Sequence, residues 1–374
     1  MSTLTSRERF VDKGFLGKIR GAGSVPGASY ETTYTYYTRN GGCLCGGAGE
    51  EVMNDVLKKL GQLGLVPVVK IDRAEDALPL ADALIAGGLP AAEITFRTAA
   101  AKDAIAAIAA ARPEMLVGAG TVLTTAQVDE AVAAGTRFIV SPGLNPKVVS
   151  YCVQRGIPVT PGVSSPSEIE QAIELGLDVV KFFPAEASGG LAKIKAMSAP
   201  YGNMRFMPTG GINADNMIPY LTNDKVLACG GSWMVASDLI NAGAWDKITE
   251  MTREAVSKML GFAIKHVGIN SADDAEAKRT ADLFSTIFGF PQKELPGSYF
   301  CGQDIEVMKT MGRGKMGHIA IMTWSVERAM AYLERNGIEL DYDTLRLDAK
   351  GKPEFIYLKQ DFGGFDVHLA VRRG

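Results

Sequence analysis

The sequence has little histidine and little cysteine. Only three histidines occur in 374 residues, and all of them lie beyond residue 265. The five cysteines are few, odd in number and scattered, which suits a reducing cytoplasm better than a disulfide framework. Chemistry in the first 265 residues must therefore use groups other than a histidine base or a histidine metal site.

Strong net charge and long apolar runs are also missing. The formal net charge of −3 gives no electrostatic footprint for nucleic acid or an anionic membrane. No apolar run reaches the ~18–20 residues that span a bilayer, and the first ten residues lack the apolar core of a signal peptide. With 47% hydrophobic residues, the chain has the composition of an ordinary globular protein. We expect a cytoplasmic protein without nucleic-acid or membrane partners.

The length predicts two domains, and the first 52 residues differ from both. Residues 1–52 are rich in Gly, Ser, Thr and Tyr and show no sustained apolar periodicity, which predicts a poorly structured extension. Cys43 and Cys45 have no second pair nearby, so a metal site there is disfavoured. We hypothesise that Met53 is the true initiator, because a helical start follows it and residues 49–52 resemble a translated ribosome-binding site.

Short apolar strands alternate with alanine-rich helical segments up to residue 260. Eight strands are predicted, at residues 65–71, 91–97, 115–122, 137–143, 157–163, 178–185, 205–212 and 226–233. Clear helical segments follow several of them, at residues 74–86, 99–111, 126–134 and 166–175. Near-continuous apolar strands in this alternation indicate a parallel sheet. Eight units in about 200 residues predict an α/β fold, a closed (β/α)8 TIM barrel over residues 53–260.

One lysine, Lys181, stands inside the apolar sixth strand. Lysine is depleted in strands and is rarely buried without a partner. Burial disfavours the charged ammonium and leaves an amine that can attack a carbonyl. The alternative is a lysine at the strand end that reaches out to solvent.

Glu93, Thr95 and Arg97 alternate along the second strand, so their side chains share one side, which we expect to be the barrel interior with Lys181. One interpretation is an internal Glu93–Arg97 pair that closes a barrel layer. In the functional interpretation, Arg97 binds a substrate carboxylate and Glu93 transfers protons. Lys181 then forms a Schiff base with a ketone.

Glycines follow the last two strands, as Gly210-Gly211 and as Gly230-Gly231-Ser232. Barrels often bind phosphate in these loops through bare backbone N–H groups. Metal-dependent aldol cleavage usually needs a histidine cluster, which the barrel segment lacks. The Schiff-base route is therefore favoured.

Six segments of the barrel carry a resemblance, at residues 93–98, 118–121, 141–143, 181–186, 208–211 and 230–233. With them, residues 53–260 resemble the 2-keto-3-deoxy-6-phosphogluconate (KDPG) aldolases, pyruvate-forming lyases that also act on 4-hydroxy-2-oxoglutarate (KHG). The resemblance implies a homotrimer without a cofactor, acting on a small 2-oxo acid sugar phosphate. It implies Lys181 as the Schiff-base lysine and Glu93 as the proton-transferring residue. It also implies a set of substrate contacts: Arg97, Thr121, Pro142, Phe183, Gly210, Gly211, Gly231 and Ser232.

Two alternatives stay open for the barrel. The enzyme could act on a galactonate-type or unphosphorylated substrate, because one loop side chain can change the preferred aldehyde. From another class, the barrel could bind phosphate without catalysis.

Residues 262–374 contain a weak internal repeat. Residues 265–270 resemble 317–322, and residues 304–308 resemble 366–370. Each half adds an amphipathic helix, at 275–288 or 326–336, which predicts a smaller α+β domain of paired βαβββ modules. This pattern resembles the glyoxalase/bleomycin-resistance/dioxygenase (vicinal oxygen chelate) family.

That second resemblance implies metal ligands at four strand positions, His266, Glu306, His318 and His368. Three imidazoles and one carboxylate would suit Zn, Ni, Co or Fe. The last position is usually glutamate in glyoxalases, so His368 departs from the pattern. Two functions compete here: a metal-dependent isomerase, lyase or dioxygenase acting on a 2-oxo or aldehyde compound, and an oligomerisation or sensing module with vestigial histidines.

Overall fold

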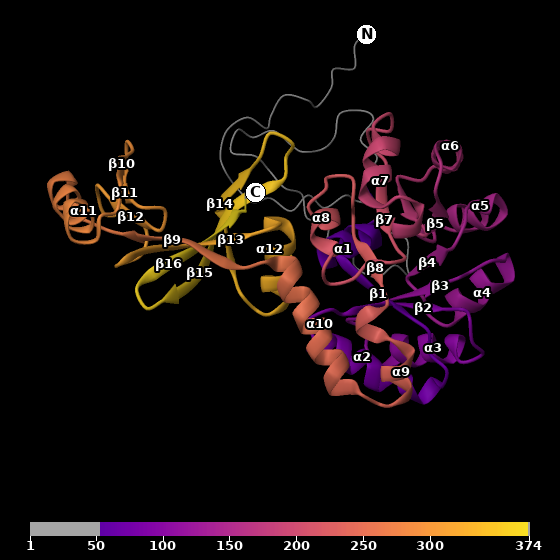
Figure 1. The fold of residues 1–374 in the computed structure, drawn as a ribbon. Helices are drawn as coiled ribbons and strands as arrows, with labels where there is room; N and C mark the ends of the chain where they lie inside the picture. The colour runs from indigo at the N-terminus through magenta and orange to yellow at the C-terminus, as the bar shows by residue number, and fades with distance from the viewer. Residues whose placement is uncertain (1–52, 373–374) are drawn as a thin grey trace, which may run out of the picture. The chain divides into compact units, whose positions relative to one another are not determined.

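A computed structural model describes residues 53–372 of the chain. The predictions made for residues 1–52, including those on Cys43 and Cys45, lie outside the described residues. The described part contains two eight-stranded sheets and the helices that accompany them (Figure 1). Both sheets were predicted, one as a barrel and one as a pair of modules.

The first sheet consists of parallel strands in sequence order: β1 (Leu65–Val69), β2 (Ala91–Thr95), β3 (Leu116–Gly120), β4 (Phe138–Ser141), β5 (Val159–Val163), β6 (Val179–Phe182), β7 (Arg205–Pro208) and β8 (Cys229–Gly231). β8 pairs with β1 in parallel, with Leu65 opposite Cys229. An isolated bridge between Thr209 and Gly230 joins β7 to β8. The sheet therefore closes on itself, as the predicted TIM-type barrel requires.

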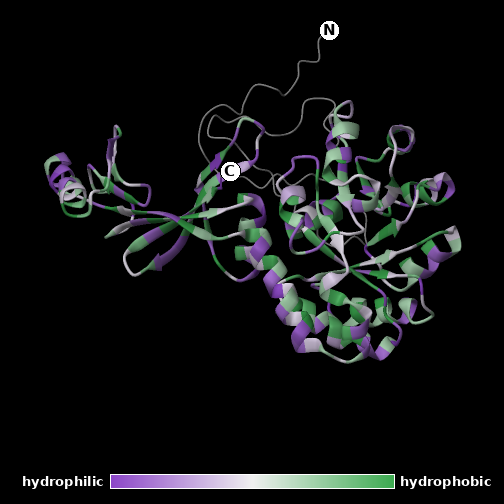
Figure 2. Cartoon of the chain, in the orientation of Figure 1, coloured by the Kyte–Doolittle hydropathy of each residue, from purple (hydrophilic) through white to green (hydrophobic). Residues whose placement is uncertain are grey.

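Helices connect the barrel strands: α2 (Ala77–Ala86), α3 (Ala101–Ala111), α4 (Thr125–Ala133), α5 (Pro146–Gln154), α6 (Pro166–Glu174), α7 (Gly190–Ser198) and α8 (Met217–Leu221). Three more complete this part: α1 (Asp55–Leu63) before β1, then α9 (Ser237–Asn241) and α10 (Trp245–Leu260) after β8. Figure 2 shows predominantly hydrophobic strands and helices with mixed faces. All residues of β2, β3 and β5 are buried, because the helices cover one face and side chains fill the other.

Several observed barrel strands end earlier than predicted. β2 ends at Thr95 and β6 at Phe182, whereas the predicted strands continued to residues 97 and 185. The residues beyond these ends belong to loops, and they include Arg97 and Phe183. Polar and glycine residues at the carboxyl ends of barrel strands thus serve the loops that form the mouth of the barrel.

The second sheet contains two similar halves. The first half comprises β9 (Ala263–Ile269), α11 (Asp274–Phe288), β10 (Gln292–Glu294), β11 (Ser298–Cys301) and β12 (Ile305–Met308). The second comprises β13 (Gly317–Thr323), α12 (Val326–Arg335), β14 (Leu340–Leu347), β15 (Pro353–Phe362) and β16 (Phe365–Val371). The strand order is β10-β11-β12-β9-β13-β16-β15-β14.

Each half places its last strand parallel to its first. β12 pairs with β9, and β16 pairs with β13, both in parallel, while β9 and β13 meet antiparallel at the centre. This is the order that two βαβββ modules give when their first strands pair. The repeat detected in the sequence therefore corresponds to equivalent strands of two modules.

A buried arginine, Arg328 on α12, contacts the barrel segment within the same structural unit. Its guanidinium donates hydrogen bonds to the carbonyls of Gly61 at 3.1 Å, Leu221 at 2.8 Å and Leu227 at 3.1 Å. Burial lowers the pKa of this guanidinium from its usual value. The three carbonyl dipoles offset part of the cost of removing the cation from water.

The sequence predicted no membrane-spanning segment and no disulfide framework, and the described residues bear on both predictions. None of their helices combines the length and the apolar character needed to cross a membrane. Cys152, Cys229 and Cys301 are buried and free.

Candidate active site and metal centre

Lys181 and Glu93 meet inside the barrel. Lys181 comes from β6 and Glu93 from β2, and both side chains are buried. The distance from Lys181 Nζ to Glu93 Oε1 is 3.3 Å. The lysine therefore does not reach out to solvent, and the Glu93 carboxylate lies next to its amine nitrogen. This pair supplies a nucleophile and an adjacent proton-transfer group.

Gly120 makes room for the Glu93 carboxylate. A Cβ atom at position 120 would lie 2.2 Å from Glu93 Oε1, far inside van der Waals contact. Gly120 ends β3, which pairs with β2, so Thr95 and Gly120 face each other across the two strands. Sequence reasoning placed Gly120 in a motif but gave it no role, because the clash appears only when neighbouring strands are in register.

Arg97 does not form the internal pair with Glu93 that one interpretation predicted. In the part of the chain that the structure describes, Glu93 pairs with Lys181, while Arg97 Nε donates to Thr95 Oγ1 at 3.1 Å. Thr95 in turn donates to the carbonyl of Val69 at 2.7 Å. Arg97 and Ser232 line one cavity of about 290 Å³. A guanidinium and a hydroxyl in one cavity can hold two ends of an anionic molecule.

Lys70 lines the same cavity and was missed in the sequence. It follows the end of β1, and its ammonium lies 2.7 Å from Asp72 Oδ1. Its sequence signal was a single charged residue near the end of the predicted apolar strand 65–71, and no second polar residue alternated with it as Glu93 and Thr95 do with Arg97.

Thr121 and Phe183 directly follow the ends of β3 and β6. Thr121 has φ 57°, in the left-handed region that a β-branched residue rarely adopts, and such backbone strain concentrates at functional sites. The Phe183 ring centroid lies 5.4 Å from Lys181 Nζ, within cation–π range. Pro142 belongs to the loop after β4, and its carbonyl packs so close to Gly162 that a Cβ there would lie 2.0 Å away.

The glycines after β7 and within β8 have structural reasons for being glycine. Gly210 and Gly211 have φ 97° and 81°, which only glycine adopts readily. A Cβ atom at Gly231 would lie 1.8 Å from the Trp233 ring. Backbone conformation and close packing therefore account for these glycines, and a phosphate site in these loops stays a prediction.

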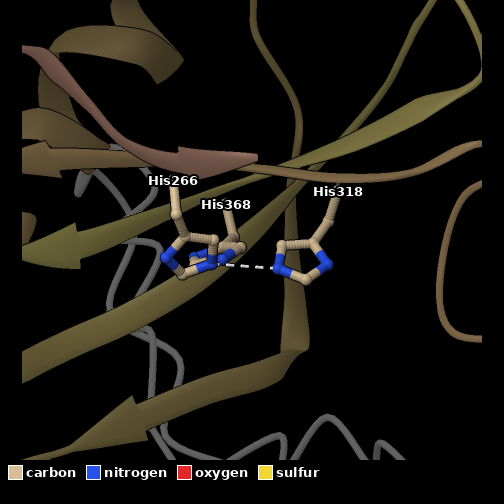
Figure 3. A group of neighbouring side chains, drawn as sticks. All are labelled: His266, His318 and His368. Atoms are coloured by element: carbon tan, nitrogen blue, oxygen red, sulfur yellow. Dashed lines mark hydrogen bonds between the residues drawn. The ribbon is translucent and has the colours of Figure 1, made fainter. Parts of the chain in front are cut away.

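All three histidines of the chain come together on the second sheet (Figure 3). His266 lies on β9, His318 on β13 and His368 on β16, and all are buried. Their candidate ligand nitrogens lie within 4.8 Å of one another. His266 Nε2 and His318 Nε2 are 3.0 Å apart. Gly268 makes this possible, since a Cβ there would lie 2.1 Å from the His318 ring.

Glu306 on β12 completes a triangle with two of the histidines. Its Oε2 atom lies 3.1 Å from His266 Nε2 and 3.2 Å from His318 Nε2. Bonds of ~2.0–2.2 Å to nitrogen and oxygen put neighbouring ligand atoms ~2.8–3.1 Å apart around an octahedral ion and ~3.3–3.6 Å apart around a tetrahedral one. The sides of the observed triangle fall between these limits. Ser298 Oγ donates to the other carboxylate oxygen, Oε1, at 2.7 Å and fixes its orientation.

The protonation states also suit a metal. Burial alone would raise the pKa of Glu306, but hydrogen bonds with His266, His318 and Ser298 hold it well below its usual range. Burial, with His318 nearby, lowers the pKa of His368 to about 3, so this imidazole is neutral. Carboxylate anions and neutral imidazoles are the forms that bind metal ions. Glu306 and His368 are therefore in the forms that bind a metal ion.

Known proteins resemble the barrel segment. The profile of the family "KDPG and KHG aldolase" matches residues 56–251, just over half of the chain. The 2-dehydro-3-deoxy-phosphogluconate aldolase of Haemophilus influenzae is 51% identical over 201 residues, which cover 54% of this chain and 95% of that protein. The KHG/KDPG aldolase of Escherichia coli is 46% identical over 192 residues, 51% of this chain and 90% of that protein.

A solved structure gives the same result. The KDPG aldolase from Legionella pneumophila, with pyruvate captured as a covalent carbinolamine intermediate, is 40% identical and has a TM-score of 0.52. The match covers 53% of this chain and 97% of that one.

Proposed function

This chain belongs to the KDPG and KHG aldolase family and is an aldehyde-lyase, and we propose that its barrel cleaves KDPG through a Schiff base on Lys181. The products are pyruvate and glyceraldehyde 3-phosphate. KHG, which would give pyruvate and glyoxylate, is the second proposed substrate. The observation that carries this proposal is the buried Lys181 side chain, whose Nζ lies 3.3 Å from Glu93 Oε1.

The reaction follows from these two groups. The neutral amine of Lys181 attacks the C2 ketone and expels water, which forms a protonated imine. The imine draws the electrons of the C3–C4 bond, while Glu93, directly or through a water, takes the proton of the C4 hydroxyl. The aldehyde leaves. The remaining enamine is protonated and hydrolysed to pyruvate, which restores Lys181.

The substrate is held by groups at the mouth of the barrel. Arg97 and Thr121 bind the carboxylate, and Gly211 and Ser232 contact the phosphate. Further contacts come from Pro142, Phe183, Gly210 and Gly231. The active form is a homotrimer. Turnover of KDPG against its C4 epimer tests the preference over a galactonate-type substrate, and light scattering tests the trimer.

Borohydride trapping tests the Schiff base. Reduction in the presence of pyruvate should add one pyruvate-derived group to Lys181, found by peptide mass analysis. The Lys181→Ala variant should trap nothing, while Lys195→Ala, an exposed lysine on α7, should trap like the parent protein. Full cleavage activity in Lys181→Ala would contradict the proposal.

For the second sheet, we propose a vicinal-oxygen-chelate-like domain that holds one divalent ion, Zn, Ni, Co or Fe. The triangle of His266, His318 and Glu306 supports this, with His368 as the fourth candidate ligand. Such an ion, when bound, would polarise a carbonyl oxygen as a Lewis acid. Ser298 orients Glu306 through a hydrogen bond, and burial of the three histidines keeps water away from them.

Elemental analysis of the untagged protein tests the metal. We expect about one ion per chain, because the four candidate ligands form a single set. The His266→Ala/His318→Ala variant should lose it, and Lys293→Ala on β10 should keep it. Absence of metal after supplementation with Zn, Ni, Co and Fe would instead leave an interaction or sensing module.

A further inference from the structure

A second cavity adjoins the histidine cluster on the C-terminal sheet. Its volume is about 280 Å³, and its lining residues are Lys265, Arg346, Glu354, Phe355, Ala370 and Val371. None of these residues was singled out in the sequence. They come from four strands: β9 and β16 carry histidines, β15 pairs with β16, and β14 pairs with β15.

Irregular strand pairing brings the charged residues to this cavity. His266 pairs with Ala320 and Ile264 pairs with Ile321, so Lys265 is an extra residue in β9. Likewise Arg346 pairs with Phe355 and Leu347 with Pro353, which leaves Glu354 as an extra residue in β15. Such β-bulges re-aim side chains and are over-represented next to active sites.

The cavity and the histidine cluster share a wall. Lys265 directly precedes His266 in the chain. The Phe355 ring lines the cavity, and its centroid lies 4.4 Å from that of the His368 ring. Phe355 also pairs with Ala370, two residues beyond His368, so all three side chains lie on one face of the sheet. A molecule in the cavity therefore lies beside the Phe355 ring, which packs against His368, one of the proposed metal ligands.

The charge and size of the cavity indicate what it takes. Lys265 and Arg346 contribute two cations and Glu354 one anion, a net positive lining. The Arg346 guanidinium lies 4.7 Å from the Phe355 ring centroid, which holds its plane against the cavity wall. Guanidinium and ammonium groups together bind carboxylate or phosphate oxygens. A volume of 280 Å³ lies just below the ~300–1,000 Å³ of drug-sized sites, so the ligand has few carbon atoms.

We propose that Lys265 and Arg346 bind the oxyanion of a small carbonyl compound, a carboxylate or a phosphate, and direct its carbonyl toward the His266–Glu306–His318 centre. The inference rests on the proposed metal centre. Pyruvate and glyceraldehyde 3-phosphate, the proposed products of the barrel, have this chemistry. The second domain would then receive a product of the first.

The test uses the full-length Lys181→Ala variant, so that pyruvate cannot form a Schiff base in the barrel. The protein is loaded with Co²⁺, whose visible absorption reports occupancy of the histidine centre. Pyruvate, glyceraldehyde 3-phosphate, inorganic phosphate and neutral acetone are then titrated, and binding is read from the change in the Co²⁺ absorption, which does not respond to anions held in the barrel. Adding the substitutions Lys265→Gln/Arg346→Gln should lower the affinity for the anion that occupies this cavity about tenfold or more. This is the loss expected when charge-assisted hydrogen bonds are removed.

The matched control removes the same charge elsewhere on the domain, as Arg279→Gln/Lys293→Gln on α11 and β10. It should change each affinity less than about twofold, as distant surface substitutions do. Loss of pyruvate binding alone identifies a carboxylate ligand, and loss of phosphate and glyceraldehyde 3-phosphate binding identifies a phosphate ligand.

The outcomes separate the two proposals. No Co²⁺ absorption in the parent protein would overturn the metal centre and this inference with it. Normal Co²⁺ absorption with anion affinities that the double variant leaves unchanged would overturn only the inference. Acetone binding as tightly as pyruvate would also overturn it, because the oxyanion would then contribute nothing.

Discussion

The barrel and the C-terminal sheet both build a site from separate strands, but at different places along those strands. In the barrel, Arg97, Thr121 and Ser232 follow the strand ends. In the C-terminal sheet, His266 and His368 occupy the middle of seven-residue strands. Glu93 and Lys181 still lie within β2 and β6, but a closed parallel barrel fills its interior with side chains, so the remaining predicted substrate contacts come from the loops at its mouth. A mixed sheet with one uncovered face can use interior strand positions.

The two sites also divide the chemistry between them. The barrel contains the buried lysine and no histidine, whereas the C-terminal sheet holds every histidine of the chain. We infer that either site can be silenced while the other still works. Substitutions that silence both sites together would break this comparison.

The largest expected effect is that of Lys181→Ala. Removing the nucleophile should lower kcat for KDPG cleavage about a thousandfold or more. Metal content should be unchanged, because Lys181 belongs to the barrel. Coupled pyruvate detection and elemental analysis of one preparation measure both. Joint loss of activity and metal would show that the sites depend on each other.

Glu93→Gln keeps the shape of the side chain but removes its proton-accepting charge. We expect kcat to fall ~10²–10⁴-fold, the usual contribution of general acid–base catalysis. Borohydride trapping of pyruvate on Lys181 should survive, which separates proton transfer from Schiff-base formation. Glu170→Gln, an exposed carboxylate on α6, is the control. An unchanged kcat in Glu93→Gln would show that the Glu93 carboxylate does not transfer the proton.

Ser298→Ala removes the hydroxyl that orients Glu306. Metal affinity should fall ~10–100-fold, as it does when groups that orient metal ligands are lost. Competition with a chelator measures this, and aldolase activity serves as the internal reference. Ser257→Ala, exposed on α10, should leave affinity unchanged. Equal affinities in the two variants would mean that Glu306 is not a ligand.

Gly120→Ala tests packing at the active site. Its Cβ would clash with Glu93 at 2.2 Å, and overpacking typically costs ~1–3 kcal/mol of unfolding free energy. Denaturation in urea measures the loss, and cleavage should fall as Glu93 is displaced. Gly202→Ala, where an added Cβ meets nothing within 4 Å, should be neutral. Equal stability of both variants would show that Glu93 can move without penalty.

The barrel could be predicted from the sequence because its signal is repeated. Each strand is apolar on both faces and each is punctuated by polar or glycine residues, so an error at one strand end does not change the fold class. The proximity of Lys181 and Glu93 was also expected, since both lie in strands that face one interior. Their pairing in preference to Glu93–Arg97 was not, because it depends on side-chain placement between β2 and β6.

The C-terminal sheet was harder to predict, since its repeat is carried by few residues. The histidines were found because all three of these rare residues fell on positions that the family resemblance assigns to metal ligands. Lys265, Arg346 and Glu354 were missed because they meet through irregular pairing, and bulges in β9 and β15 leave no mark in an alternating pattern.

Arg328 has a consequence for how the protein denatures. Its guanidinium donates hydrogen bonds to three carbonyls, which belong to α1, α8 and the segment before β8. If α12 unfolded alone, these carbonyls and the apolar side chains around them would have to be resolvated while the barrel stayed intact. The buried core is continuous from Leu60 to Val326 and Ala329. We therefore expect heat to melt the barrel and the C-terminal sheet in one cooperative transition, and chain cleavage at Gly261 to yield a barrel less heat-resistant than the intact protein.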